Sequence, residues 1–475
     1  MRIHGSEPRG LRRVPRSPID AGRFGRMFRR LQAAPSYEEP ELQALAETMR
    51  EDVGGNTGSW GQPDAQPEGG DNADLPAAYT YFGQFVDHDI TFDPASELQR
   101  QNDPDALRDF RTPRFDLDSV YGSGPADEPF QYDRANSGRM LIGSAGEQAD
   151  LPRNVQEVAL IGDPRNDENT IVSQLQLVFL QAHNKLADQV EADAAVPAER
   201  KFEETQRRLR WHYQWVVVHD FLPRVCGKAL VEELFDHDPT SSLPRFNLRH
   251  YRPKNDPYMP VEFSAAAFRY GHSQVRSAYN LNDAIQNIPI FAPGDDVQPT
   301  DDLRGGKILP PAWSIVWGHF LPIAGSTPQP SRLIDSHLTP ALFDLPRFPV
   351  EEPQSLALRN LLRGQALGLP SGQDVARFLG VPQVLTGADL GDVLEPTPLW
   401  FYILKEAELK ADESGNTGRQ LGPAGARIVA EVLLGILKGD PLSYVNVQPT
   451  WTPTLAAADP EPGFTLADLV SFATG

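Results

Sequence analysis

Apolar residues in the longest readable segment of the chain recur with the period of an α-helix. Their positions differ by three or four residues and so define one helical face: Ile171, Leu175, Val178, Ala182, Leu186 and Val190. Similar apolar stripes run through residues 205–221, 356–362, 373–379 and 425–437. Alternating β-branched runs joined by Asn-Gly or Asp-Gly turns are scarce. The pattern predicts a mainly α fold with little β structure.

Proline-rich segments separate these helical stretches. The chain contains 44 prolines, clustered at residues 289–299, 310–311, 340–349 and 449–462. Proline interrupts helices and sheets, so these clusters predict long irregular connections between the helices. Residues 51–76 are rich in Gly, Pro and Asp without any period, and we expect them to form an exposed loop.

The length of 475 residues and the hydrophobic fraction of 40% suffice for a large buried core. No internal repeat is visible, and the residues before the loop at 51–76 are too few for a core of their own. We therefore expect one large helical domain over residues 31–475, preceded by a basic arm over residues 1–30 that carries nine Arg. The arm is interpreted as solvated, with docking to an acidic partner or acidic surface as the alternative.

Charge and composition exclude several classes of function. The net charge of −21 repels phosphate backbones, so nucleic-acid binding is disfavoured. No apolar run is long enough to span a membrane, and no signal peptide follows the N-terminal arginines. Cys226 is the only cysteine, so no intrachain disulfide can form, and we expect it to be a buried, inert thiol. A cytoplasmic location, or export without a cleavable leader, is expected.

A polar cluster occurs inside the aromatic-rich segment 79–92. Gln84, Asp87 and His88 are spaced so that a helix places them on one face. One interpretation is a structural cluster whose members satisfy one another's hydrogen bonds. The other is a proton-transfer histidine beside a carboxylate and an amide, because imidazole titrates near neutral pH. Three polar groups on one face favour the second interpretation.

The segment 112–122 carries oxygen-bearing groups at alternate positions. These groups are Thr112, the backbone carbonyl of Arg114, Asp116 and Asp118. Together with Asp89, which follows His88, they could direct oxygens toward one hard cation such as Ca²⁺. The alternative is an Asp-rich turn that holds no ion.

A third segment, 162–168, joins an arginine to a carboxylate just before the longest helical stripe. Arg165 is always charged and offers a fork of donors suited to polarising a bound peroxide and to stabilising charge on a departing oxygen. The alternative is a surface salt bridge between Arg165 and Glu168.

The order and spacing of these segments resemble the animal-type haem peroxidases of the peroxidase–cyclooxygenase superfamily, and in particular their bacterial members. Gln84-x-x-Asp87-His88-Asp89 is similar to the family's distal haem motif, residues 112–122 to its calcium loop, and residues 162–187 to its catalytic-arginine segment. The resemblance covers about residues 22–445. It implies a single helical haem peroxidase domain.

The resemblance also implies cofactors and their ligands. Haem b would lie beside His88, with ester bonds to Asp87 and Glu168 as an option, and Ca²⁺ would bind the 112–118 loop. At Asp118 the family usually has Ser, and the added carboxylate is expected to tighten cation binding. His183, in the following helix, is expected to be a structural core histidine.

Residues 267–275 are similar to the family's proximal segment. The resemblance implies that His272 is the axial ligand of the haem iron and that Asn360 contacts its second ring nitrogen. Arg269 and Arg363, each three residues along a helix from a haem-facing residue, would hold the haem propionates. Taken singly, His272 would be a core histidine and Asn360 a helix-surface residue.

The implied activity is reduction of hydrogen peroxide through a ferryl intermediate, with His88 moving the proton and Arg165 balancing charge. The donors would be halide, thiocyanate or small aromatic compounds such as phenols, and Gln84 would position water or halide. Myeloperoxidase, a member of this family, has a Met directly after the ester-forming Glu, whereas Asn169 follows Glu168 here. We therefore expect iodide, bromide or thiocyanate to be oxidised more easily than chloride.

Two other functions remain open at this stage. A fatty-acid oxygenase of the same superfamily has a radical-forming Tyr three residues before the proximal His, where this chain has Arg269. A non-catalytic haem- or calcium-bearing adhesion or interaction protein is the other alternative. The presence of both His88 and Arg165 favours the peroxidase.

Overall fold

The computed structural model describes residues 24–52, 70–91, 112–236, 244–253, 257–292, 294, 297–345, 353–391, 393–458 and 463–475. The described part is mainly helical, as the apolar periodicity predicts. Most of the predicted basic arm, residues 1–23, lies outside the described residues. The division into arm and domain therefore stays a prediction.

The longer α-helices are α1 (Glu39–Thr48), α2 (Ala78–Ile90), α4 (Thr170–Ala192), α5 (Lys201–Trp215), α9 (Leu356–Ala366), α10 (Gly372–Leu379), α11 (Leu399–Leu409), α12 (Pro423–Gly439) and α14 (Leu466–Thr474). The short α-helices are α3 (Asp118–Tyr121), α6 (Leu222–Cys226), α7 (Lys228–Leu234), α8 (Val261–Ser264) and α13 (Tyr444–Val447). Short 3₁₀ turns link them, among them η2 (Pro164–Asp167) and η5 (Ala267–His272).

Strands form two-stranded ribbons only, within the part of the chain that the structure describes. The pairs are β1 (Phe24–Gly25) with β7 (Met259–Pro260), β2 (Asp71–Pro76) with β10 (Pro330–Arg332), β3 (Gly143–Ala145) with β4 (Gln148–Asp150), β5 (Phe235–Asp236) with β6 (Arg245–Phe246) and β8 (Ala278–Tyr279) with β9 (Ile288–Pro289). Only β1 and β7 pair in parallel. The ribbons lie between helices and do not form a layer of their own.

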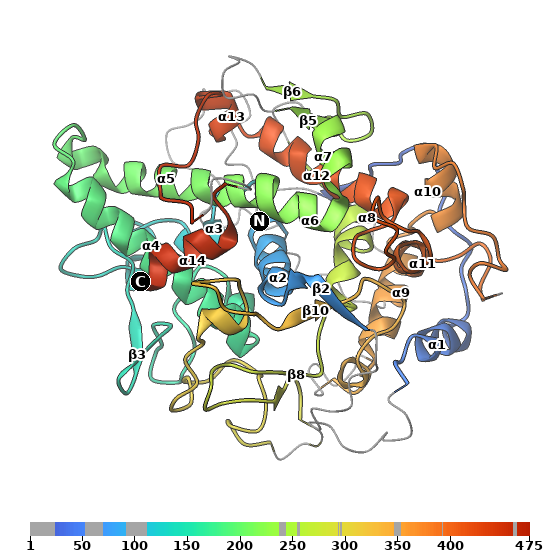
Figure 1. Ribbon diagram of the computed structural model, residues 1–475, viewed down its shortest axis with the longest axis horizontal. Coiled ribbons are helices and arrows are strands. Elements are labelled where there is room, and N and C mark those ends of the chain that lie inside the picture. Colours follow the sequence, from blue (N-terminus) through green and yellow to red (C-terminus); the bar gives the residue numbers. More distant parts are fainter. Residues whose placement is uncertain are drawn as a thin grey trace, which may run out of the picture.

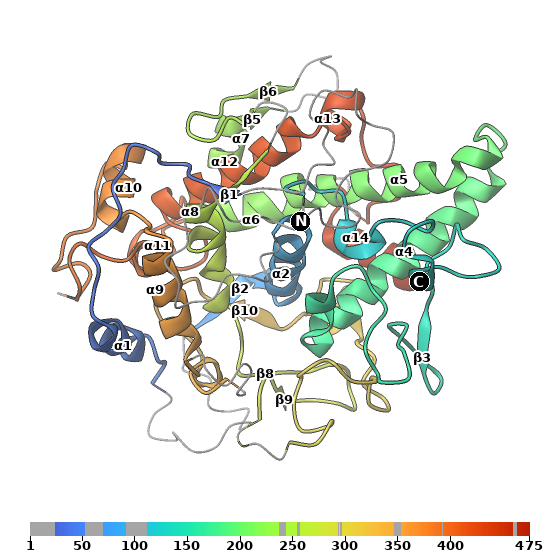
Figure 2. The same ribbon diagram turned by 180° about the vertical axis from the view of Figure 1, so that it is seen from behind.

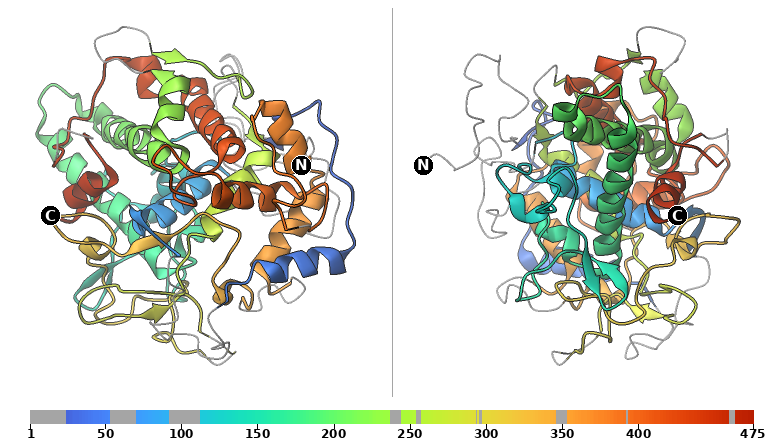
Figure 3. Two further views of the ribbon diagram at one scale, coloured as in Figure 1. Left: turned by 45° about the vertical axis from the view of Figure 1, so that its right-hand side comes forward. Right: turned by 90° about the vertical axis from the view of Figure 1, so that its left-hand side faces the viewer.

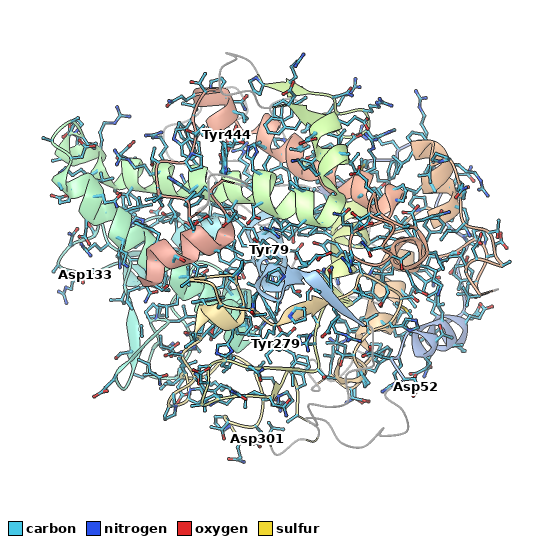
Figure 4. The ribbon with its side chains drawn as sticks, in the orientation of Figure 1. Asp52, Tyr79, Asp133, Tyr279, Asp301 and Tyr444 are labelled. Carbon is cyan, nitrogen blue, oxygen red and sulfur yellow. The ribbon has the colours of Figure 1, made fainter. Side chains whose placement is uncertain are left out.

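Helix α2 runs through the middle of the molecule, with α4, α5, α6 and α9 around it (Figures 1 and 2). Its apolar side chains are fully buried, including Phe82, Phe85 and Val86. Tyr79, on the same helix, lies near the centre of the molecule, whereas Asp133 and Asp301 lie at its edge (Figure 4). A polar group on α2 is therefore placed in the interior, where it needs a partner.

Helix α4 confirms the longest predicted stripe. The Asn169 side chain accepts a hydrogen bond from the Val172 backbone N–H and caps the helix at its start. The C-terminal helix α14 packs along α4 (Figure 3). The start of α4 is thereby fixed next to the segment that contains Arg165.

The predicted helix over residues 205–221 is divided in the structure. Helix α5 continues into a π-helical turn, η4 (Val216–Phe221), and then into α6, which has Pro223 in its first turn. The loop prediction for residues 51–76 is wrong at its C-terminal end, because residues 71–76 form β2 and pair with β10. Residues 53–69 lie outside the described part.

None of the helices among the described residues is long and apolar enough to cross a membrane. Cys226 is buried and free, and burial raises the pKa of its thiol, as expected for an inert cysteine.

Candidate active site

The predicted polar face of α2 is present. His88 is buried, Gln84 is half-buried one turn before it on the same helix, and Asp87, directly before it, is also half-buried. Phe85 stacks on Phe179 of α4 at a centroid distance of 4.4 Å, which fixes how α2 is rotated against α4. The helix thereby directs its polar face toward the start of α4.

Asn166 is the hydrogen-bond partner of His88. Its amide oxygen lies 2.7 Å from Nδ1 of His88, and its Nδ2 donates to Oε1 of Gln176 over 2.9 Å. Asn166 and Gln176 are both fully buried, one in η2 and the other in α4. Sequence analysis missed both residues; the only available indication was an amide directly after Arg165 in the segment 162–168.

Arg165 is held inside the protein and contacts the C-terminal end of α2. Its guanidinium pairs with the buried Asp163 over 2.8 Å and donates to the backbone carbonyls of His88 and Thr91. A cation at this end of a helix satisfies terminal carbonyls and opposes the negative end of the helix dipole. The arginine therefore fixes the backbone of His88, while its action on peroxide stays a prediction.

Glu168 lies in front of the second ring nitrogen of His88. Its Oε1 is 3.9 Å from His88 Nε2 and accepts a hydrogen bond from the Gln84 amide. The Gln84 carbonyl in turn accepts from Nδ2 of Asn169 over 3.3 Å, so the direction of the Gln84 amide is set. Three predicted distal residues, Gln84, His88 and Glu168, thus come together.

The Glu168 side chain borders solvent-accessible space beside His88, which we call the hollow. This side chain is 49% exposed, and burial of its surroundings raises the pKa of its carboxyl group to about 7. Asp87 shows the same combination: it is half-buried, and burial raises its pKa although Arg165 and Arg269 act in the opposite direction.

Buried ion pairs hold the segment that carries Arg165 and Glu168. Arg153 forms a bidentate ion pair with Asp167 at 2.6 and 2.7 Å and also contacts Asp150. All three side chains are nearly inaccessible to solvent. A paired, buried cluster of this kind holds the backbone in one position.

The proximal residues also meet as predicted. His272 ends η5, and its Nδ1 lies 2.8 Å from Nδ2 of Asn360 on α9. Arg269 donates to the Asn360 amide oxygen over 2.8 Å and so sets the direction of that amide. Burial, and then Arg269, lower the pKa of His272 to about 3, so its imidazole is neutral.

The segment between Arg269 and His272 differs from the prediction in one respect. It is a 3₁₀ turn rather than an α-helix, because Ala266 leaves helical geometry just before it. Burial, and then the neighbouring Arg363, lower the pKa of Arg269 to about 10, and Arg165 acts in the same direction. Arginines from both sides of the site therefore repel one another in a partly dehydrated interior, which an anionic ligand would relieve.

The predicted cation ligands form a second polar cluster, which includes Asp89 near the C-terminal end of α2. Asp89, Asp116 and Asp118 each offer an oxygen within 4.8 Å of the others. Asp89 is fully buried and accepts hydrogen bonds from the backbone N–H groups of Leu117 and Ser119. Thr112 donates to Asp116 over 2.6 Å. Oxygen ligands therefore converge where the sequence predicts Ca²⁺, next to His88.

His183 is placed as a core residue. It is fully buried, and its two ring nitrogens contact the Tyr121 hydroxyl and the Gly138 carbonyl, each at 2.9 Å. Burial lowers its pKa to about 4. Neither contact leads toward the hollow in front of His88.

The animal haem peroxidase family model matches residues 99–406. The chain belongs to the animal haem peroxidase family. The matched region contains residues 112–122, residues 162–168 and the segments with His272 and Asn360, and the predicted distal motif lies just before it.

Curated relatives are similar at low identity. They include peroxidasin homolog pxn-2 of Caenorhabditis elegans (24% identical, 74% of this chain and 25% of the relative), human thyroid peroxidase (27%, 50% and 24%) and mouse myeloperoxidase (27%, 50% and 31%). The chain thus spans about a quarter to a third of the length of these relatives.

Solved structures confirm the fold. Peroxidase A from Dictyostelium discoideum superposes with a TM-score of 0.68 at 16% identity, covering 96% of this chain and 93% of that one. A fatty acid alpha-dioxygenase from Oryza sativa gives a TM-score of 0.60 at 14% identity, covering 93% of this chain and 78% of that one. At these identities the likeness concerns the fold alone.

The residues of this site fit a haem group. His272 would bind haem iron through Nε2 once the Asn360 amide presents its oxygen to Nδ1, which requires Arg269 to leave that oxygen and pair with an anionic group such as a propionate. The mutually repelling Arg269, Arg363 and Arg165 match an anionic group such as a propionate. Glu168 shows the exposed, protein-surrounded surface that a bound planar group would cover.

Proposed function

We propose that this chain is a hydrogen-peroxide-dependent haem peroxidase that oxidises halides, thiocyanate or small aromatic donors. The observation that carries the proposal is the position of His88. Its Nδ1 faces a buried amide, and its Nε2 lies 3.9 Å from Glu168, at the hollow. We assign to Nε2 the exchange of a proton with a small molecule.

Haem, when bound, supplies the redox chemistry. His88 accepts a proton from hydrogen peroxide at Nε2 and returns it to the departing oxygen, which is general base and then general acid catalysis. Arg165 holds the backbone carbonyl of His88 and adds positive charge to the site. Gln84 presents its amide N–H group, because its carbonyl is engaged by Asn169, and it thereby favours water or an anion.

His272 and its neighbours would hold the cofactor. Its Nε2 would bind the haem iron, Asn360 would orient the ring, and Arg269 and Arg363 would pair with the propionates. Asp87 and Glu168 are the two carboxylates available for ester bonds to haem.

Calcium is the second proposed cofactor. Asp89, Asp116 and Asp118 would contribute carboxylates, and Thr112 and the Arg114 carbonyl would complete the ligand set. Because Asp89 follows His88 on α2, a bound cation would stabilise the end of the helix that carries the proton-transfer group.

A fatty-acid oxygenase is the second candidate function, since the fold is shared with fatty acid alpha-dioxygenases. Arg269 opposes it, because this residue stands where the oxygenase requires a radical-forming Tyr, and because it is engaged with Asn360. Tyr270, one residue further, is buried and points elsewhere on the turn.

The test is turnover by the haem-loaded chain with hydrogen peroxide and a series of donors. We expect oxidation of guaiacol, iodide, bromide and thiocyanate, and much slower oxidation of chloride, because Asn169 cannot form the sulfonium link of a Met. Oxygen uptake with palmitic acid in place of peroxide turnover would support the oxygenase instead. Chloride oxidation at the rate of bromide would refute the proposed donor preference.

A further inference from the structure

Two buried amides connect His88 to the protein interior. His88 contacts the Asn166 amide oxygen at 2.7 Å, and Asn166 donates to Gln176 over 2.9 Å. Asn166 and Gln176 are both 0% exposed, so neither contact competes with bulk solvent. Their elements, η2 and α4, are successive along the chain: η2 ends at its C-cap Glu168, and α4 begins at its N-cap Asn169.

A neutral imidazole has one nitrogen that donates and one that accepts a hydrogen bond. In the structure the Asn166 amide donates its N–H to Gln176 and directs its carbonyl oxygen toward His88. A carbonyl oxygen can only accept. The ring proton is therefore placed on Nδ1, and Nε2 keeps its lone pair on the side of Glu168.

We propose that Asn166 is a positioning residue that holds His88 in the tautomer with its proton on Nδ1. The inference deepens the proposed peroxidase function and rests on it, because a lone pair at Nε2 is what allows His88 to accept a proton from peroxide. An amide does this without adding charge to the site, unlike a carboxylate in the same place. Asp167 directly follows Asn166. Its ion pair with Arg153 therefore holds the backbone of Asn166 and keeps the Asn166 amide opposite His88.

The tautomer can be read directly by NMR. The full-length chain, haem-loaded and in its diamagnetic ferrous carbonyl form, would be labelled with ¹⁵N-histidine, and His88 assigned through His88→Ala. Long-range ¹H–¹⁵N correlations should show the proton of His88 on Nδ1 in the wild type. In Asn166→Ala the Nε2-protonated form should appear. A wild-type His88 protonated on Nε2 overturns the proposal, even where the variant does not fold.

Ligand binding gives a second readout that separates positioning from general damage. Hydrogen cyanide must lose its proton as it binds ferric haem, whereas carbon monoxide binds ferrous haem without proton transfer. Asn166→Ala should slow cyanide association at least about tenfold and leave carbon monoxide association within about twofold. Equal effects on both ligands, or none on cyanide, would overturn the proposal.

Asn72→Ala is the matched control. Asn72 is also 0% exposed, and its amide donates to the backbone carbonyl of Arg419 over 3.0 Å. The control variant therefore loses the same chemical group, an amide, from an equally buried position. It should leave both the tautomer of His88 and the cyanide rate unchanged. Failure of the wild type to bind haem would instead count against the proposed function itself.

Discussion

The backbone N–H of Gly305 donates to the carbonyl oxygen of Glu168 over 2.9 Å, although the two residues are far apart in sequence. The next residue, Gly306, donates in the same way to Asp167 over 2.8 Å. A Cβ at Gly305 would overlap the Asp167 carbonyl group, so only glycine permits this approach. The loop thereby fixes the backbone of the carboxylate that faces His88.

Gly305→Ala should consequently displace the segment that contains Arg165 and Glu168. We expect the reaction with hydrogen peroxide to slow by about 10- to 100-fold and the free energy of unfolding to fall by about 1–3 kcal/mol. Stopped-flow absorption and urea unfolding measure the two effects. Gly364→Ala is the control, because its Cβ would meet its nearest neighbour, Leu369, at an ordinary 3.5 Å. Equal rates for the two variants would contradict the assigned role of Gly305.

Calcium should stabilise the protein through the Asp89, Asp116 and Asp118 cluster. Addition of Ca²⁺ to chelator-treated protein should raise Tm by several degrees, since a ligand that binds only the folded state stabilises it. Asp118→Asn should weaken this response, and Asp116→Asn should do the same. The exposed Asp127→Asn serves as control. An undiminished calcium response in both cluster variants would place the ion elsewhere.

In protein whose Glu168 is not ester-bonded to haem, the ionisation of Glu168 should control anion binding at the hollow. Burial raises its pKa to about 7, so the carboxyl group is neutral below that pH and negatively charged above it. Bromide affinity, followed through the haem absorption, should fall about fivefold or more from about pH 6 to about pH 8 because of repulsion. Glu168→Gln should flatten this part of the profile, and an unchanged slope in that variant would refute the explanation.

His183 should make the folded state less stable in acid. Burial lowers its pKa to about 4 in the folded protein, so the unfolded chain, with an ordinary value of about 6.5, binds the proton first. The contribution of neutral His183 to the free energy of unfolding is fully present above about pH 6.5. It is lost as the pH falls toward 4, by at most about 1.4 kcal/mol per pH unit. Urea unfolding of His183→Gln across this range should show a shallower decline. The exposed His337→Gln should behave as the wild type.

Periodic segments could be predicted from the sequence, because each carries its own evidence. The stripe from Ile171 to Val190 specifies α4 without reference to the rest of the chain. The spacing of Gln84 and His88 likewise places both on one face once a helix is assumed. In β2, by contrast, the sequence DNADLP has no alternation, and its pairing with β10 depends on residues about 260 positions away.

The sequence indicated many residues of the site, but it did not indicate most of the contacts between them. Resemblance to the family indicated His272, Asn360 and Arg269, which the structure brings together. No local pattern shows that Asn166 faces His88, because the contact joins residues 78 positions apart. The approach of Gly305 to Asp167 is similarly a property of the folded chain, since neither residue has a periodic neighbourhood.

The most direct test of the central claim is the change in haem absorption after one equivalent of hydrogen peroxide is mixed with the haem-loaded chain, compared with His88→Ala. We predict one haem per chain, a rapid change in the wild type, and a change slower by about 100-fold or more in the variant. Absence of stoichiometric haem binding, or an equally fast reaction in His88→Ala, would contradict the assignment of this chain as a peroxidase that works through His88.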